Sequence, residues 1–218
     1  MFTLVTIGQT PREDLMKVID RGGIGDFQLV GVLDGVSNDE INMLEKIPGE
    51  EKLYVVLNDG TANINHDSIE QRVEMLITKY EDSSDAIAVL CMSEFKCTSD
   101  QTTIIYPIKE LHEKARNINS HDTTIIFIPI KEQLQSAEIK WQNVKGDKRF
   151  FVAPPKSKNI LEILNKEIML HRPTNVILDC YGYAYELVDE IESNHNCTCY
   201  NAQHLVVKKL RDLTTVSK

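Results

Sequence analysis

Two of the five cysteines in this sequence stand where a side chain could do chemistry. Cys91 ends the most apolar run of the first half of the chain, AIAVLC, and Cys180 follows the apolar run NVIL in the second half. A cysteine at the end of a strand, beside the start of a helix, can have a lowered pKa and can act as a base or a nucleophile. Free cysteines are also commonly buried as small apolar side chains. Two cysteines at matching places, one in each half, favour the chemical interpretation.

Polar and small residues follow both cysteines. Ser93 lies in the motif LCMSEF, and Tyr181 and Tyr183 flank Gly182 in the motif LDCYGY. Because glycine has no Cβ, Gly182 would allow a ligand to approach the backbone closely. We take these residues as candidate ligand contacts.

The stretch IGQTPRED near the N-terminus is typical of a helix start. Gly8 permits a tight turn. Thr10 and Glu13 have the spacing of a capping box, and Pro11 would take the first helical position. Helix formation therefore explains most of this motif without any ligand.

Gln9 and Arg12 are left unexplained by that account. A helix N-terminus offers free N–H groups and a positive dipole end, which suit a carboxylate or a phosphate. Arg12 carries the wrong charge for that dipole, so helix stability does not favour it there. Its guanidinium can make a bidentate contact with an anionic ligand, or it can pair with Glu13 or Asp14 on the surface. Spacing alone leaves both alternatives open.

Short apolar runs alternate with amphipathic stretches along the whole chain. We predict strands near 2–7, 28–33, 53–57, 86–91, 123–128, 149–153, 175–179 and 197–200. We predict helices near 11–21, 38–47, 68–81, 107–118, 130–141, 158–170, 184–193 and 202–213. Strands that are apolar throughout and separated by helices indicate parallel sheets covered on both faces, so the predicted fold class is α/β.

Turn and capping patterns add detail to this prediction. Ser37 and Asp67 each precede a glutamate by three residues, as Thr10 does, which predicts helix caps there. The segment NDGT at 58–61 predicts a turn that closes a small hairpin over 53–65. With about four strands on either side, we place a boundary near residue 105. The predicted domains are 1–105 and 106–202, with the segment 203–218 packing back on the first.

In open parallel sheets, ligands bind beyond the carboxyl ends of the strands. The segments directly after the predicted strands are 8–12, 34–37, 58–61, 91–95, 129–133, 154–157, 180–183 and 201–204. Asp34 and Gln133 lie in two of these segments and join the candidate ligand contacts.

Several function classes lack support in the sequence. The motif HNCTC has no second ligand pair at a suitable spacing, so packing explains Cys197 and Cys199 better than a metal. The sequence contains no GxGxxG after the first strand, no P-loop and no GxSxG. We expect no cofactor and no metal. The net charge of −9 over 218 residues disfavours nucleic acid and anionic membranes as partners. The absence of a signal peptide, and of a disulfide framework among the cysteines, favours a cytoplasmic setting.

The motifs TIGQTPRED, VLDGVS, LCMSEF, KW at 140–141 and LDCYGY occur in the order found in the AroM family, which this chain resembles from residue 5 to about residue 210. AroM proteins are similar to the aspartate/glutamate racemase superfamily. That resemblance implies two Rossmann-like halves related by a pseudo-twofold axis, with a ligand cleft between them. It also implies that Cys91 and Cys180 lie on opposite sides of the substrate α-carbon, and that the Gln9–Arg12 loop cradles the substrate.

The sequence departs from the racemase pattern beside both cysteines. Met92 and Tyr181 stand where racemases commonly have a threonine that binds the substrate carboxylate, and Ser93 is the alternative hydroxyl after the first cysteine. The two cysteines also match in strand order only if the segment 53–65 is an insertion. The leading prediction is a cofactor-independent racemase, isomerase or lyase acting on a small carboxylic acid. The alternatives are a carboxylate-binding or regulatory protein on the same fold, and two buried, inert cysteines. Dimers are common among such folds, so a homodimer is one expected state.

The substitution Arg12→Ala tests the candidate ligand loop. We expect it to cost little stability and much ligand affinity, because the guanidinium would bind the ligand's anionic group. Thermal unfolding and ligand titration would measure the two effects separately. Equal ligand affinity in the variant would count against a ligand role for Arg12.

Overall fold

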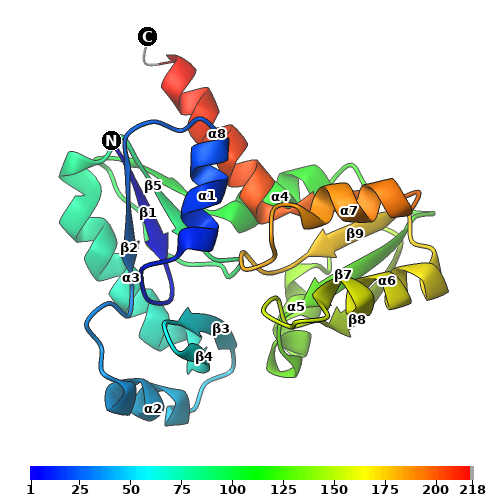
Figure 1. Ribbon diagram of the computed structural model, residues 1–218, viewed down its shortest axis with the longest axis horizontal. Helices are drawn as coiled ribbons and strands as arrows, with labels where there is room; N and C mark the ends of the chain where they lie inside the picture. The colour runs from blue at the N-terminus through cyan, green and yellow to red at the C-terminus, as the bar shows by residue number, and fades with distance from the viewer. Residues whose placement is uncertain (217–218) are drawn as a thin grey trace. The chain divides into compact units, whose positions relative to one another are not determined.

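The structure is a computed structural model that describes residues 1–216, and it divides the chain into two compact units (Figure 1). The first contains Met1–Pro107 together with the chain from Val206 onward, and the second contains Ile108–Leu205. We propose that these units are the predicted domains 1–105 and 106–202. Residues 217 and 218 of the predicted segment 203–218 lie outside the described residues.

The first unit is built on a parallel sheet of four strands. These are β1 (Phe2–Thr6), β2 (Phe27–Gly31), β5 (Ala86–Leu90) and β6 (Thr103–Ile105), in the order β2-β1-β5-β6. Every residue of β1 and β5 is buried; β5 is wholly apolar, and β1 is apolar except for the buried Thr3 and Thr6. Strand β6 was missed in the sequence because only three residues form it.

The second unit repeats this arrangement. Its strands β7 (Thr123–Ile128), β8 (Asp147–Val152), β9 (Asn175–Leu178) and β10 (Thr198–Asn201) are also parallel, in the order β8-β7-β9-β10. Counted within each unit, both sheets run second, first, third, fourth strand. The prediction of an α/β fold with two similar parallel halves is confirmed, and β5 and β9 are equivalent strands.

The hairpin predicted over 53–65 is confirmed, as an insertion between β2 and β5 that is separate from the first sheet. Strands β3 (Lys52–Leu57) and β4 (Gly60–Asn65) pair antiparallel and form a sheet of their own. If the hairpin is not counted, β5, which precedes Cys91, is the third strand of the first unit. In the same way β9, which precedes Cys180, is the third strand of the second unit. The insertion that the strand count required is therefore present.

Helices flank both sheets. Those of the first unit are α1 (Glu13–Arg21), α2 (Asn38–Lys46), α3 (His66–Tyr80) and the short 3-10 helix η1 (Glu81–Ser83). The rest of the chain contributes α4 (Pro107–Ala115), the 3-10 helix η2 (Lys131–Gln133), α5 (Leu134–Lys140), α6 (Ile160–His171), α7 (Leu187–Asn194) and α8 (Ala202–Val216). Among the described residues, no helix is both long and apolar enough to cross a bilayer.

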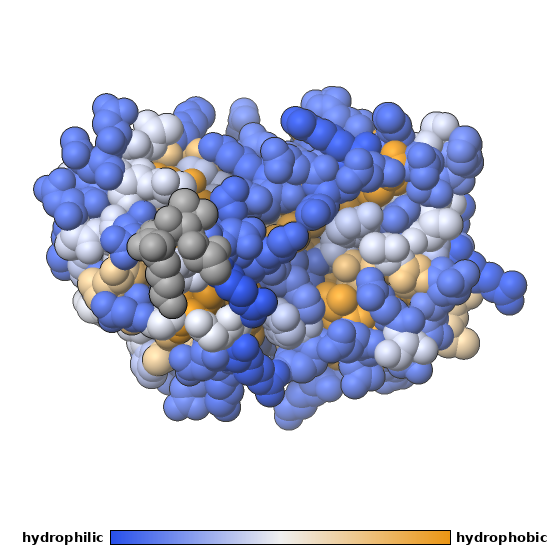
Figure 2. All heavy atoms as spheres, turned by 90° about the horizontal axis from the view of Figure 1, so that it is seen from above, coloured by the Kyte–Doolittle hydropathy of each residue, from blue (hydrophilic) through white to orange (hydrophobic). Residues whose placement is uncertain are grey.

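Packing of these helices follows their apolar faces. In the second unit, Leu164 and Ile168 of α6 and Leu187 and Ile191 of α7 share one buried cluster with residues of β7 and β9. In the first unit, α8 packs on the end of α1, where Arg211 donates two hydrogen bonds to the Gly22 carbonyl at 2.8 and 3.1 Å. The surface seen in Figure 2 is mostly hydrophilic, with apolar side chains in small patches.

Two of the three predicted helix caps are wrong. Ser37 forms the predicted capping box with Glu40. Helix α1, however, begins at Glu13, and the Thr10 hydroxyl donates to Asp34 instead of capping the helix. Pro11 therefore lies before the helix and not at its first position. Helix α3 is capped by Asn65, whose side chain accepts the Asp67 N–H at 2.7 Å. In both failures a residue outside the capping pattern made the better hydrogen bond.

Gly8 lies where the first strand meets the hairpin. A Cβ at this position would stand 1.9 Å from the carbonyl oxygen of Val56, which is backbone and cannot swing away. Gln9 donates its N–H to the same oxygen at 3.2 Å, so the two segments are held together.

We therefore expect Gly8→Ala to lower the free energy of unfolding by about 1–3 kcal/mol or more, as overpacking does in well-packed interiors. Gly25→Ala is the matched control, because a Cβ at Gly25 would meet nothing within 4 Å. The control should be neutral or slightly stabilising, by about 0.4–1 kcal/mol. Urea unfolding of both variants would measure the difference, and equal stabilities would contradict the close approach at Gly8.

Candidate active site

The strand registers make Cys91 and Cys180 equivalent residue for residue. In the first unit Thr6 pairs with Leu90, and the Thr6 carbonyl accepts the N–H of Val32. In the second unit Phe127 pairs with Leu178, so the next residue, Ile128, lies level with Asp179. The Ile128 carbonyl accepts the N–H of Ala153, as Thr6 accepts that of Val32. Leu90 and Asp179 thus occupy the same place, and each cysteine comes next.

Both thiol sulfurs accept the same kind of hydrogen bond. The Ser93 N–H donates to Cys91 Sγ at 3.5 Å, and the Gly182 N–H donates to Cys180 Sγ at 3.4 Å. In each unit the donor lies two residues after the cysteine. The turn after the cysteine therefore has the same hydrogen bond in both units. The two cysteines differ in exposure, since Cys91 is 7% exposed and Cys180 is only half-buried.

Asp34 organises the loop after β1. Its carboxylate accepts the Thr10 N–H at 2.7 Å, the Thr10 hydroxyl at 2.9 Å and the Gly31 N–H at 2.7 Å. These bonds tie the loop after the first strand to the loop after the second. Asp34 and Thr10 are therefore hydrogen-bonded to each other, and their contact with a ligand stays a prediction.

Gln9 joins three loops through its amide. Its nitrogen donates to the carbonyls of Leu33 and Val36 at 3.4 and 3.3 Å, and its oxygen accepts the Asn58 N–H at 3.1 Å. Both ends of the side chain thus hold the hairpin turn and the β2 loop in place. Sequence reasoning could not see this, because the partners lie 24 to 49 residues away.

Arg12 pairs with Asp14, one of the two partners that the sequence left open, but it does so as a buried residue and not on the surface. Its Nε and Nη2 each donate to Asp14 at 2.8 Å, and the residue is 8% exposed. The pairing turns the guanidinium along the start of α1 and engages two of its three nitrogens. A ligand contact through the third, Nη1, stays a prediction.

The loop after Cys91 is anchored by the hairpin and α3. The Ser93 hydroxyl donates to Glu51 at 2.9 Å. The Nε2 atom of His66 lies 2.9 Å from the carbonyl oxygen of Glu94, and the His66 ring stacks on Phe95 with centroids 5.0 Å apart. Glu51, just before β3, and His66, at the start of α3, thus fix the residues that follow the first cysteine.

The loop after Cys180 is anchored from inside its own unit. Tyr183 is fully buried, and its hydroxyl donates to the Ala153 carbonyl at 2.6 Å. Gln203 Nε2 donates to the Tyr181 carbonyl at 2.9 Å, and Asn201 Nδ2 donates to the Tyr183 carbonyl at 3.3 Å. The Tyr183 ring belongs to the core between the sheet and its helices, so packing accounts for this residue.

Asp179, directly before Cys180, is a functional candidate that the sequence analysis missed. Its carboxylate accepts the Trp141 indole N–H at 2.8 Å, and Lys140 Nζ lies 2.8 Å from its other oxygen. The motif KW at 140–141 is thus in contact with the motif LDCYGY. The only signal in the sequence was an aspartate at the end of an otherwise apolar strand.

Gln133 ends η2 in the loop after β7, which is the counterpart of the loop after β1. The residue is half-buried, and its carbonyl accepts the Ser136 hydroxyl at 3.1 Å. Its role in ligand binding stays a prediction.

Three potential metal ligands, His66, Asp67 and Glu70, lie within 4.8 Å of one another at the start of α3. Asp67 has a side chain that is 84% exposed, and Glu70 accepts the N–H of Lys96 at 2.6 Å. His66 is hydrogen-bonded to the Glu94 carbonyl. Local hydrogen bonds therefore account for His66 and Glu70 without a metal ion. In the motif HNCTC, Cys199 packs in the core of the second unit, as the packing interpretation predicted.

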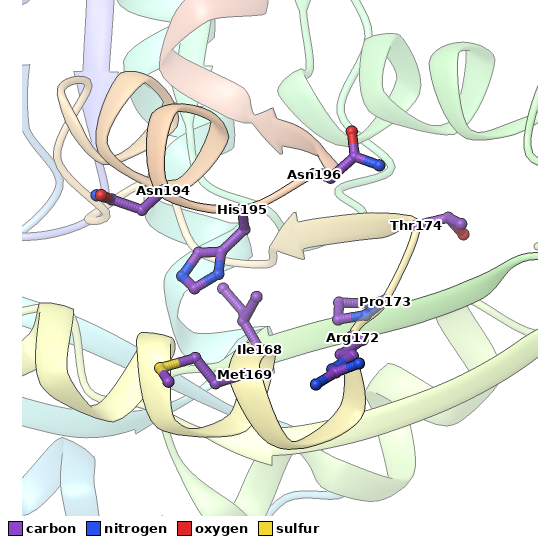
Figure 3. A pocket seen from close by; sticks show the side chains of 8 residues that line it. All are labelled: Ile168, Met169, Arg172, Pro173, Thr174, Asn194, His195 and Asn196. Atoms are coloured by element: carbon purple, nitrogen blue, oxygen red, sulfur yellow. The ribbon is translucent and has the colours of Figure 1, made fainter.

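A groove of about 510 Å³ lies at the amino-terminal end of β9, whereas Cys180 follows its carboxyl end (Figure 3). Its lining consists of Ile168, Met169, Arg172, Pro173, Thr174, Asn194, His195 and Asn196. Thr174 precedes β9, whereas Cys180 follows that strand, so the groove is separate from the candidate site.

The family model for AroM proteins matches residues 2–214. The chain belongs to the AroM family. No curated protein sequence gives a match.

Solved structures of the same fold span nearly the whole AroM chain. The allantoin racemase from Klebsiella pneumoniae superposes with a TM-score of 0.59 at 10% identity, covering 99% of this chain and 88% of its own. The aspartate racemase of Picrophilus torridus gives 0.59 at 13% identity, with 98% and 94% covered. Unliganded arylmalonate decarboxylase gives 0.57 at 7% identity, with 97% and 91% covered. At such identities the likeness establishes a racemase-like fold for the AroM protein.

Thiol labelling tests the described environments of the cysteines. Burial raises the pKa of the Cys199 thiol, and Cys197 and Glu192 raise it further. Burial, followed by Glu70 and Glu74, raises the pKa of the Cys97 thiol. Since only the thiolate reacts, we expect iodoacetamide at about pH 8 to modify half-buried Cys180 before Cys97 and Cys199.

Mass spectrometry of the peptides from the native protein would give the order. In urea all five cysteines should react at similar rates, which controls for the reagent. If Cys199 reacted as fast as Cys180 in the folded protein, the described burial would be wrong.

Proposed function

We propose that this AroM protein is a cofactor-independent enzyme of the racemase or isomerase type that acts on a small carboxylic acid. Cys91 and Cys180 would be its acid–base pair. The observation that carries the proposal is the repeated geometry: each cysteine directly follows the same position of an equivalent strand, and each sulfur accepts an N–H from two residues further on.

The proposed reaction moves one proton at each face of one carbon. One cysteine, as thiolate, takes the proton from the α-carbon, and the other, as thiol, donates its proton to the opposite face. Two such groups should have sulfurs roughly 6–8 Å apart, each about 3–4 Å from the carbon. A free cysteine has a pKa of about 8.5, so the thiolate needs modest help, and the hydrogen bond to each sulfur supplies it.

The substrate carboxylate would bind at loops that are held rigidly in place. We assign it to the Gln9–Arg12 loop in the first unit, with Arg12 as the charged donor, and to the loop that begins at Tyr181 in the second. The N–H groups of Gln9, Thr10 and Gly182 already donate to Val56, Asp34 and Cys180, so they hold these loops in shape. Donors that are already fixed stabilise the growing enolate-like charge without reorganisation. Asp34 and Gln9 would act mainly by holding these loops. The proposal includes a reducing cytoplasmic setting, which keeps both thiols free, and a homodimer.

One observation favours the second candidate function, a carboxylate-binding protein without turnover. The residues that follow the cysteines are Met92 and Tyr181, and neither has a serine-like or threonine-like hydroxyl that could bind the substrate carboxylate. The nearest such group, the Ser93 hydroxyl, already donates to Glu51. A site with fewer carboxylate donors binds and polarises its ligand less strongly, which lowers the expected rate of proton transfer.

Isotope exchange distinguishes the two functions. The protein would be incubated in D₂O with single enantiomers of aspartate, glutamate and other small chiral carboxylic acids, and followed by NMR and optical rotation. An enzyme should incorporate deuterium at the α-carbon and lose optical rotation. Because each positioned acid or base contributes about 10²–10⁴-fold, Cys91→Ala and Cys180→Ala should each slow racemisation by that factor.

Cys197→Ser is the control, because this half-buried cysteine lies outside the site and its variant should keep the rate. Unchanged racemisation in Cys91→Ala would exclude the two-thiol mechanism. A ligand that raises the melting temperature while no deuterium is incorporated would favour the binding protein.

A further inference from the structure

The two equivalent strands differ at the residue before the cysteine. In the first unit this residue is Leu90, and in the second it is Asp179, whose side chain is 2% exposed. A buried carboxylate in place of a leucine is costly unless it is paired and hydrogen-bonded. The sheet needs no charge at this position, because its counterpart in the first unit is apolar.

Both oxygens of Asp179 have a partner from the turn that ends α5. Trp141 is fully buried and donates its indole N–H to Oδ2 at 2.8 Å. Lys140 has a side chain that is 13% exposed, and its Nζ lies 2.8 Å from Oδ1. The Asp179 N–H also donates to the Phe127 carbonyl at 2.9 Å. Backbone and side chain of Asp179 are therefore both fixed, directly before Cys180.

We propose that Lys140, Trp141 and Asp179 form a positioning cluster that orients Cys180 and balances the charge of the residue directly before it. The cluster rests on the proposed function, in which Cys180 exchanges a proton with the substrate. Asp179 holds the backbone at the end of β9 in place, and Cys180 is the next residue. Lys140 cancels the Asp179 charge, which would otherwise disfavour a thiolate at the next residue.

Two further titratable side chains lie beside the cluster. The His112 ring stands edge-on to Trp141, with ring centroids 4.8 Å apart, on the side of the indole provided by α4. Tyr183 lies three residues after Cys180 and donates its hydroxyl to Ala153. Neither group is a carboxylate, so Asp179 is the carboxylate of this cluster.

The two partners of the ion pair predict opposite effects. Removing the Asp179 charge makes the surroundings of Cys180 more positive, and removing the Lys140 charge makes them more negative. Asp179→Asn keeps an acceptor for Trp141 but leaves the Lys140 charge unbalanced, which favours the thiolate. Lys140→Met leaves the Asp179 charge unbalanced, which disfavours it. A change of half a pKa unit alters the thiolate fraction about threefold.

The test is the rate of Cys180 modification by iodoacetamide at about pH 7, where the thiolate fraction limits the rate, measured by mass spectrometry on the full chain. We expect at least about a threefold increase in Asp179→Asn and at least about a threefold decrease in Lys140→Met. The double variant should return to within about twofold of the unsubstituted protein. If Lys140→Met does not fold, the test still decides. The modification rate in Asp179→Asn is then compared with the rate in the double variant, which lacks the unbalanced Lys140 charge.

Lys145→Met removes an exposed lysine from the same unit and should leave the rate unchanged. Equal rates in all folded variants, or a shift of the same sign in both single variants, would overturn the charge-balancing role and leave the cluster purely structural. The readout needs no turnover, so failure of the proposed function would appear separately, as an absence of deuterium exchange.

Discussion

The pairing of β1 with β5, and of β7 with β9, is the constraint on which the candidate site depends. In a parallel sheet every strand ends at the same edge, so the residues after the third strand emerge beside those after the first. The register places Leu90 level with Thr6, and it places Asp179 one step beyond Leu178, level with Ile128. Each cysteine therefore leaves its sheet at the same point. The turn that follows brings an N–H onto each sulfur, so the resemblance of the two sites is a property of the backbone.

Polar side chains near the cysteines are largely used to hold the loops. Asp34 accepts three hydrogen bonds, and the Ser93 hydroxyl is used on Glu51. A buried or half-buried polar group needs a partner, and within a folded chain that partner is usually another loop. Loops fixed in this way present their backbone N–H groups in a set direction.

The sequence allowed the prediction of whatever depends on local pattern. Apolar runs gave the buried strands, NDGT gave the hairpin, and Ser37 gave its capping box. Features that depend on a distant partner were missed. Thr10 has a capping pattern, but Asp34, 24 residues away, is the acceptor for its hydroxyl. Likewise Trp141 reaches Asp179 across 38 residues. Propensity cannot rank a local hydrogen bond against one that only the tertiary fold creates.

A reaction with two thiols needs them in different protonation states at the start, although the two residues are chemically the same. A symmetric scaffold by itself would give both the same environment. Here the duplication is broken at the residue before each cysteine and in the exposure of the sulfurs. Cys91 is buried behind Leu90, and burial disfavours the charged form of a thiol. Cys180 is half-buried, and the residue before it is paired with Lys140, so the proposal assigns the thiolate to Cys180. In the proposed reaction the asymmetry therefore makes Cys180 the base and Cys91 the acid in the free enzyme. One turnover leaves Cys180 as the thiol and Cys91 as the thiolate, so the reverse reaction can follow at once, whereas a second turnover in the same direction first requires Cys180 to lose a proton and Cys91 to regain one.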